Sequence, residues 1–270
     1  MKHRVYRSLI AAALLLGLAG LARSADKPKP PQAPKAPANT RKIPSVPINP
    51  HALEILDQMC KVFTSAKAFS YHAEINFDSV LPSDVKLQFA AAMDVALARP
   101  DHLAVSYDSD LGGKRMWYDG KTVTVLDPAH MTYATVAAPP SIDKMLEQFA
   151  KERNVSIPLE GFDFSHPCER IRGNLLHGAY VGVGDVDGAD YDHLAFTQKS
   201  VDWQIWIDRT KRPLPRKVVI TYTSLPMAPQ YSAVLTHWNF DPKFPADFFA
   251  PQIPKKALRI KFIEMKEKRK

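Results

Sequence analysis

The chain has 270 residues, of which 46% are apolar, and this is enough for one domain with a sizeable core. Its formal net charge is +8, but residues 1–24, 25–48 and 255–270 carry +4, +4 and +6, which leaves −6 on residues 49–254. A nucleic-acid-binding domain needs basic residues on the folded surface that meets phosphate, so this distribution argues against a nucleic-acid partner.

Residues 1–24 have the three parts of a secretory signal peptide. A basic start precedes an apolar run from Leu9 to Leu21, and small residues lead to a plausible cleavage site after Ser24. The run is about 13 residues long, whereas a membrane-spanning helix needs about 20. The sequence therefore predicts export rather than a membrane anchor.

The next segment, residues 25–48, is rich in Pro, Ala and Lys and has almost nothing to bury, which predicts an extended, polyproline-like linker. Residues 49–262 follow as a single domain without an internal repeat or a second linker. Residues 263–270 form a basic tail. The tail is either a solvated terminus or a weak contact with an anionic membrane surface.

An amphipathic helix is predicted over residues 49–67, because its apolar side chains recur at helical spacing: Ala52, Ile55, Leu56, Met59, Val62 and Phe63. The period then changes to two. Residues 69–77 and 85–97 each place apolar side chains at odd positions and mostly polar ones between them. This alternation predicts two long antiparallel strands, each with one apolar face.

Shorter strands are predicted at 102–107 and 131–136, with a hairpin between them marked by Asp119-Gly120. A second helix is predicted over 141–153. Further strands are predicted at 180–184, 191–198, 201–208, 216–224 and 230–239. The expected fold class is α+β: a large, curved antiparallel sheet of about ten strands, an open half-barrel with two or three helices at its mouth.

Trp203 and Trp206 lie three residues apart on the strand 201–208, so their rings must point to opposite faces of the sheet. Trp203 shares its register with the apolar residues Ile205 and Ile207. We therefore expect Trp203 on the inner face and Trp206 on the outer face.

Three stretches of the chain resemble a known family: "YDGKTVTVLDPAHMTYATVAAPPSIDKML", "DWQIWIDRTKRPLPRKVVITY" and "DFFAPQIPKKALRIKF". The family consists of periplasmic proteins filed as domain of unknown function 2092, and it is similar in fold to the lipoprotein carriers LolA and LolB. The resemblance covers roughly residues 50–262. It implies a periplasmic location, a half-open antiparallel barrel whose mouth is plugged by helices, and an apolar interior that holds acyl chains.

Candidate site residues follow from the apolar stripes. We predict a non-enzymatic protein whose partner is a lipid or a lipoprotein acyl chain, held in a cavity lined by Phe89, Met93, Trp117, Tyr133, Trp203 and Ile205. Two alternatives remain open: a sensor or protein-interaction module that uses the same barrel, and a hydrolase built around His193.

No cofactor or metal is expected. The nine histidines include no HExxH motif and no pair at zinc-ligand spacing. The stretch "GVGDVDG" (residues 182–188) has the wrong spacing for a dinucleotide loop and lacks the last ligand of a calcium loop, so it is interpreted as a hairpin turn.

The two cysteines, Cys60 and Cys168, are separated too widely for a CxxC motif. An oxidising compartment permits a disulfide between them. Alternatively, Cys60 is simply a small apolar residue on the buried face of its helix.

Overall fold

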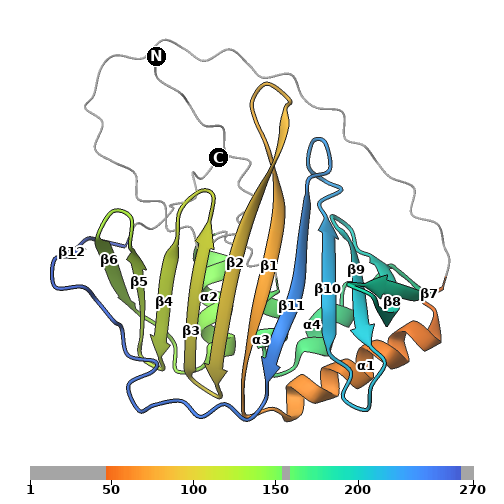
Figure 1. Ribbon diagram of the computed structural model, residues 1–270, viewed down its shortest axis with the longest axis horizontal. Coiled ribbons are helices and arrows are strands. Elements are labelled where there is room, and N and C mark those ends of the chain that lie inside the picture. Colours follow the sequence, from red (N-terminus) through yellow and green to blue (C-terminus); the bar gives the residue numbers. More distant parts are fainter. Residues whose placement is uncertain (1–46, 154–158, 263–270) are drawn as a thin grey trace.

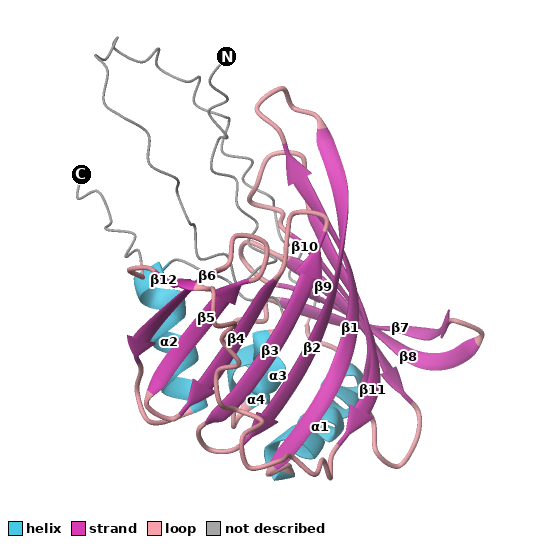
Figure 2. Ribbon diagram, turned by 60° about the vertical axis from the view of Figure 1, so that its left-hand side comes forward, coloured by secondary structure: helices cyan, strands magenta, loops and turns pink. Residues whose placement is uncertain are grey.

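The computed structural model describes residues 47–153 and 159–262. The predicted signal peptide, nearly all of the predicted linker and the basic tail lie outside the described residues. Within the described part, twelve strands form one curved sheet, and four helices cover its concave face (Figure 1 and Figure 2).

The sheet has the strand order β12-β6-β5-β4-β3-β2-β1-β11-β10-β9-β8-β7. Neighbouring strands are antiparallel, except that the short β12 runs parallel to β6. The strands are β1 (Ala68–Val80), β2 (Lys86–Ala98), β3 (His102–Ser109), β4 (Lys114–Asp119), β5 (Thr122–Asp127), β6 (Thr132–Ala137), β7 (His177–Val186), β8 (Ala189–Thr197), β9 (Asp202–Asp208), β10 (Pro215–Thr221), β11 (Gln230–Asn239) and β12 (Leu258–Arg259).

The helices are α1 (Pro50–Ser65), α2 (Ile142–Arg153), α3 (Glu160–Asp163) and α4 (Pro167–Arg172). Helix α1 begins where the Asn49 side chain accepts hydrogen bonds from the backbone N–H groups of His51 and Ala52, and Pro50 suits the first turn. The Asn49 backbone N–H donates to the carbonyl of Gly178 at 2.9 Å. The start of α1 is therefore held against β7.

The core lies between the helices and the concave face of the sheet. The odd-numbered residues of β1 from Phe69 to Phe77 are buried there, and they pair across the sheet with odd-numbered residues of β2. The apolar side of α1 contributes further buried side chains, among them Leu56, Met59 and Phe63. The period-two and period-3.6 patterns of the sequence therefore meet in one core.

A β-bulge reverses the alternation at the end of β11. Tyr231, Ala233 and Leu235 are buried on the concave face, but His237 has φ +52° and the pairing with β1 shifts there. The next side chain, Trp238, consequently turns into the core, where its ring centroid lies 4.6 Å from that of Tyr71. His237 is left on the convex face.

The predicted fold class is confirmed, and every strand expected from the sequence is present. The stretch "GVGDVDG" forms the β7–β8 hairpin, with φ of 54° at Asp187 and 79° at Gly188, positive at both central residues of the turn. The described part holds twelve strands rather than about ten. Sequence patterns missed α3, α4 and β12, because elements of four, six and two residues are too short to show a period.

Candidate functional site

An apolar cavity of about 190 Å³ lies between the short helices and the strands β9 and β10 on the concave side. Its lining comprises Leu159, Gly161, Phe162, Ile171, Gln198, Val201, Trp203, Ile205, Val218 and Ile220. Only Gln198 brings a polar side chain to this lining. The cavity is thus suited to a hydrocarbon group and offers little to a charged one.

Strand register explains why the sheet side of this cavity is apolar. Trp203 lies opposite Phe196 on β8 and Ile220 on β10, and Ile205 lies opposite Val218. The rings of Trp203 and Phe196 stack with their centroids 4.4 Å apart. This stack fixes the Trp203 ring as a wall of the cavity.

Trp206 lies on the opposite, convex face, as strand alternation requires. Its ring stacks on His193 with a centroid separation of 4.0 Å, and the Lys217 Nζ lies 5.1 Å from the ring centroid. The two tryptophans of β9 therefore have different surroundings, one apolar and one polar.

Phe89 and Met93 also lie on the concave face, but they pack in the core formed by β1 and β2 and do not line this cavity. Met93 is buried, and Phe89 packs against Phe77 with ring centroids 5.7 Å apart.

Trp117 and Tyr133 do not line this cavity as predicted, because the structure places both on the convex face. On β4, Met116 and Tyr118 are buried in the core, so the alternation turns Trp117 outward. Tyr133 lies opposite Leu126 on that same outer face. Of the six predicted lining residues, Trp203 and Ile205 are the two that this cavity brings together.

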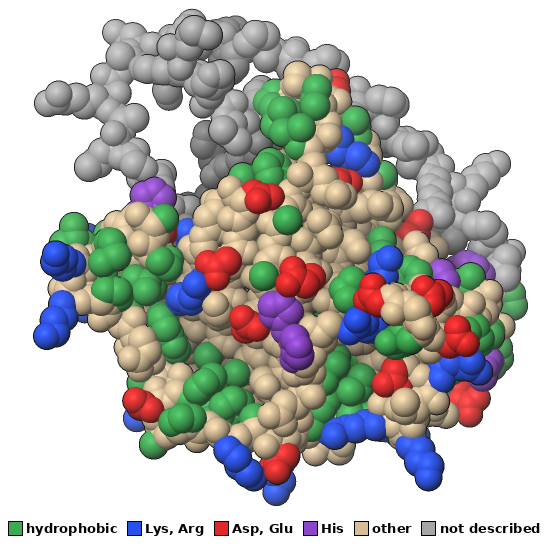
Figure 3. All heavy atoms as spheres, in the orientation of Figure 1, with side chains coloured by type: hydrophobic (Ala, Val, Ile, Leu, Met, Phe, Trp, Pro, Cys, Tyr) green, Lys and Arg blue, Asp and Glu red, His purple; other side chains and the backbone are tan. Residues whose placement is uncertain are grey.

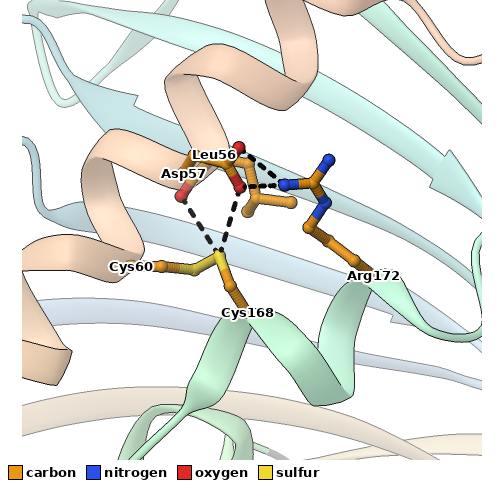
Figure 4. Close-up of a disulfide and its surroundings, with 5 residues drawn as sticks. All are labelled: Leu56, Asp57, Cys60, Cys168 and Arg172. Atoms are coloured by element: carbon orange, nitrogen blue, oxygen red, sulfur yellow. Dashed lines mark hydrogen bonds and ion pairs between the residues drawn. A yellow bond between two sulfur atoms is a disulfide. The ribbon is translucent and has the colours of Figure 1, made fainter.

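A disulfide joins the helices next to the cavity. Cys60 on α1 and Cys168 on α4 are bonded, with their Cα atoms 5.6 Å apart (Figure 4). Beside them, the Nη1 atom of Arg172 donates to both carboxylate oxygens of Asp57, at 2.8 and 2.7 Å. Both links tie α4, which carries the lining residue Ile171, to the long helix α1.

Arg99 anchors the other short helix, and sequence reasoning missed it because no motif marks it. Its Nη1 donates to the carbonyl of Asp163 at 2.8 Å, and its Nη2 donates to the carbonyl of Phe164 at 2.9 Å. These carbonyls lie at the end of α3, where orphan acceptors need donors. Burial lowers the pKa of Arg99, while Asp163 opposes this shift.

A second and larger cavity, about 780 Å³, lies on the convex face between the sheet and the segment 242–252. We call it the convex groove. Its floor includes three small side chains on neighbouring strands, since Ser70 pairs with Ala96 and Ala96 with Ala104; Ala104 in turn pairs with the large Trp117. Pro242, Phe244, Pro245 and Phe248 of the C-terminal segment also line it.

His72 lies between two carboxylates beside the convex groove. Its Nδ1 is 2.7 Å from Asp94 Oδ1, and its Nε2 is 2.9 Å from Glu74 Oε1. Hydrogen bonds to Glu74 and then to Asp94 raise the pKa of His72 above 6.5, against the opposing effect of burial. The ring of His237 lies 5.8 Å from that of His72, and Figure 3 shows histidine side chains surrounded by acidic ones in the middle of this face.

The sequence comparison identifies the family. The model of the predicted periplasmic protein family DUF2092 matches residues 52–263. The chain belongs to this family. No curated protein matches the DUF2092 chain.

Solved structures similar to this DUF2092 protein have low sequence identity to it. LprF from Mycobacterium bovis is 15% identical with a TM-score of 0.45, and the match covers 78% of this chain and 100% of LprF. The lipoprotein LppX from Mycobacterium tuberculosis is 11% identical (TM-score 0.41, coverage 72% and 100%). A LolA superfamily protein from Nitrosomonas europaea is 13% identical (TM-score 0.36, coverage 74% and 97%).

His193 on β8 has an amide and an indole ring as its neighbours on the convex face. Its Nε2 is 3.0 Å from Gln204 Oε1, and its ring is covered by Trp206. Burial lowers the pKa of His193. The adjacent carboxylate of Asp192 accepts a hydrogen bond from the Tyr180 hydroxyl at 3.0 Å, so Asp192 is bonded to Tyr180 rather than to the His193 ring.

Residues 47–153 and 159–262 contain no group of three or more His, Cys, Asp or Glu side chains that could hold a metal ion. Among the helices in these ranges, none is long and apolar enough to cross a membrane.

Proposed function

We propose that this DUF2092 protein is a periplasmic binding protein that holds a lipid, or the acyl part of a lipoprotein, without performing chemistry on it. The observation that carries the proposal is the apolar cavity bounded by Trp203 and Ile205 on the sheet and by Phe162 and Ile171 on the helices. Each methylene that moves from water into such a cavity contributes about 0.8 kcal/mol.

The size of the cavity limits what enters it. Its volume of about 190 Å³ is below the roughly 300 Å³ at which complete small-molecule sites begin. We therefore infer that the cavity receives the end of an acyl chain, while the polar part of the lipid stays outside.

The periplasmic location is supported by two observations. The family is described as one of predicted periplasmic proteins, and the chain carries a disulfide, a bond that persists in oxidising compartments and is rare in the cytosol. The predicted signal peptide at residues 1–24 agrees with this location.

A brominated fatty acid tests the proposal, because bromine quenches tryptophan fluorescence only at short range. We expect saturable quenching, and Trp203→Ala should remove most of it. Trp206→Ala is the matched control, since this ring lies on the same strand but on the convex face. It should leave the affinity within about twofold.

Equal losses from the two substitutions, or quenching by the wild type that never saturates, would contradict acyl binding at this cavity. Lipid mass spectrometry of an extract from the native protein would then identify the occupant. We expect a molecule with at least one acyl chain.

A further inference from the structure

The convex groove has the lining of a site for an extended, proline-rich segment. Trp117 lies at one end of the groove floor, and Phe244 and Phe248 line the groove from the segment 242–252, which faces the floor. Phe248 is 39% exposed although it is a large apolar residue. Grooves lined by aromatic side chains bind polyproline II helices, since proline rings pack against flat aromatic faces at a low entropy cost.

The charge of the groove favours a basic occupant. The carboxylates of Asp94 and Glu74 are 67% and 66% exposed, and the imidazole of His72 serves both of them. The Arg and Lys side chains that line the groove already form ion pairs, Arg115 with Asp108 and Lys243 with Asp241. Asp247 adds a further exposed carboxylate to the lining.

One segment of this chain has the matching chemistry. Residues 27–37, "KPKPPQAPKAP", lie outside the described residues, and in their sequence Pro28, Pro31, Pro34 and Pro37 recur every third position. A polyproline II helix has three residues per turn, so these four prolines would share one face. Lys27 precedes the first of these prolines, Lys29 and Lys35 lie between them, and all three lysines carry positive charge.

The length of chain allows this segment to reach the groove. The described chain starts beside β7, where Asn49 is bonded to Gly178, and β1 is five strands further along the sheet. At about 4.8 Å per strand this is ~24 Å, and residues 38–46 would span ~28 Å in a polyproline II conformation at 3.1 Å per residue. Trp117 lies on β4, three strands or ~14 Å beyond β1, and residues 27–37 would themselves span ~34 Å in that conformation.

We propose that residues 27–37 bind in the convex groove of the same chain, with the proline face against Trp117 and Phe248 and the lysines toward Asp94, Glu74 and Asp247. This interaction is independent of the acyl cavity, which lies on the other side of the sheet. It would fold the N-terminal segment onto the domain.

A bimane label at position 33 tests the proposal in the full chain. Because Cys60 and Cys168 are paired, Ala33→Cys introduces the thiol that reacts. Contact with tryptophan quenches bimane fluorescence. Because the tether gives the segment a millimolar effective concentration, even a weak site stays largely occupied, and we expect low emission from the wild-type groove. Trp117→Phe should raise this emission by about twofold or more. Trp206→Phe, on the same face but outside the groove, should leave the emission unchanged.

Charge and concentration give two further readouts. Asp94→Asn combined with Asp247→Asn should raise the emission, and added salt should do the same, because both weaken the attraction between the segment and the groove. Emission that is insensitive to Trp117→Phe overturns the proposal. Quenching that grows with protein concentration also overturns it, because the occupant would then be the segment of a second copy.

Discussion

Reduction of the Cys60–Cys168 disulfide is expected to destabilise the folded domain strongly. The two cysteines are 108 residues apart in sequence, and in the chain-entropy model the closure of a loop of about 100 residues restricts the unfolded state by about 4.7 kcal/mol. For a domain of this size, a change of 1 kcal/mol in the free energy of unfolding shifts Tm by about 2–4 °C, so reduction should lower Tm by roughly 9–19 °C.

Urea unfolding of the wild type with and without reductant measures this difference, because reduction removes no atoms from the buried site around Cys60. The variant Cys168→Ser in non-reducing buffer is the second measurement, and alkylation followed by mass spectrometry reports free thiols. A difference below about 1 kcal/mol between the oxidised and reduced protein would refute the loop-closure reasoning. So would two thiols that are alkylated readily in the native, unreduced protein.

Three further outcomes are expected. Burial raises the pKa of Asp127, but the hydrogen bonds from Lys114 and His130 outweigh burial and lower this pKa to about 2. The ionised Asp127 therefore stabilises the folded state fully above about pH 4, and this contribution is lost as the pH falls toward 2. At pH 7, Asp127→Asn should lower the free energy of unfolding in urea by about 3 kcal/mol. The midpoint of His72 in an NMR titration should lie above 6.5 and should fall in Asp94→Asn, whereas an unchanged midpoint would contradict the assigned hydrogen bonds. Arg99→Met removes both donors to the end of α3, so amide exchange should accelerate there before it does so in β1; uniform acceleration would contradict a local role.

The strands could be predicted because their apolar faces alternate over many residues. On β1 and β2 the pattern fixes register as well as type, since a slip of one residue would turn Phe69 and Leu97 out of the core. On β9 it also placed Trp203 on the concave face and Trp206 on the convex face.

Other features gave no readable signal. Trp117 and Tyr118 are both large aromatic residues, so the sequence does not say which one faces the core, and here Tyr118 is the buried one. The bulge at His237 depends on a positive φ, which His adopts more readily than most residues but still uncommonly, so the residue type alone does not mark the bulge. The convex groove was missed because the segment 242–252 that lines it has no regular period.

The β1–β11 pairing has a consequence for how the chain folds. This pairing joins residues far apart in the sequence, such as Ser70 and Asn239. The strands β1 to β6, and likewise β7 to β11, are instead joined by hairpins between consecutive strands, and β12 is added to β6 at the edge. Local hairpins form faster than pairings between distant segments. We therefore expect two half-sheets to form first and to join late along the β1–β11 boundary. The disulfide also links the two halves, because Cys60 precedes β1 and Cys168 precedes β7. During the proposed export, β1 would leave the channel well before β11 (Gln230–Asn239), so one edge of β1 would stay unpaired until β11 had followed it.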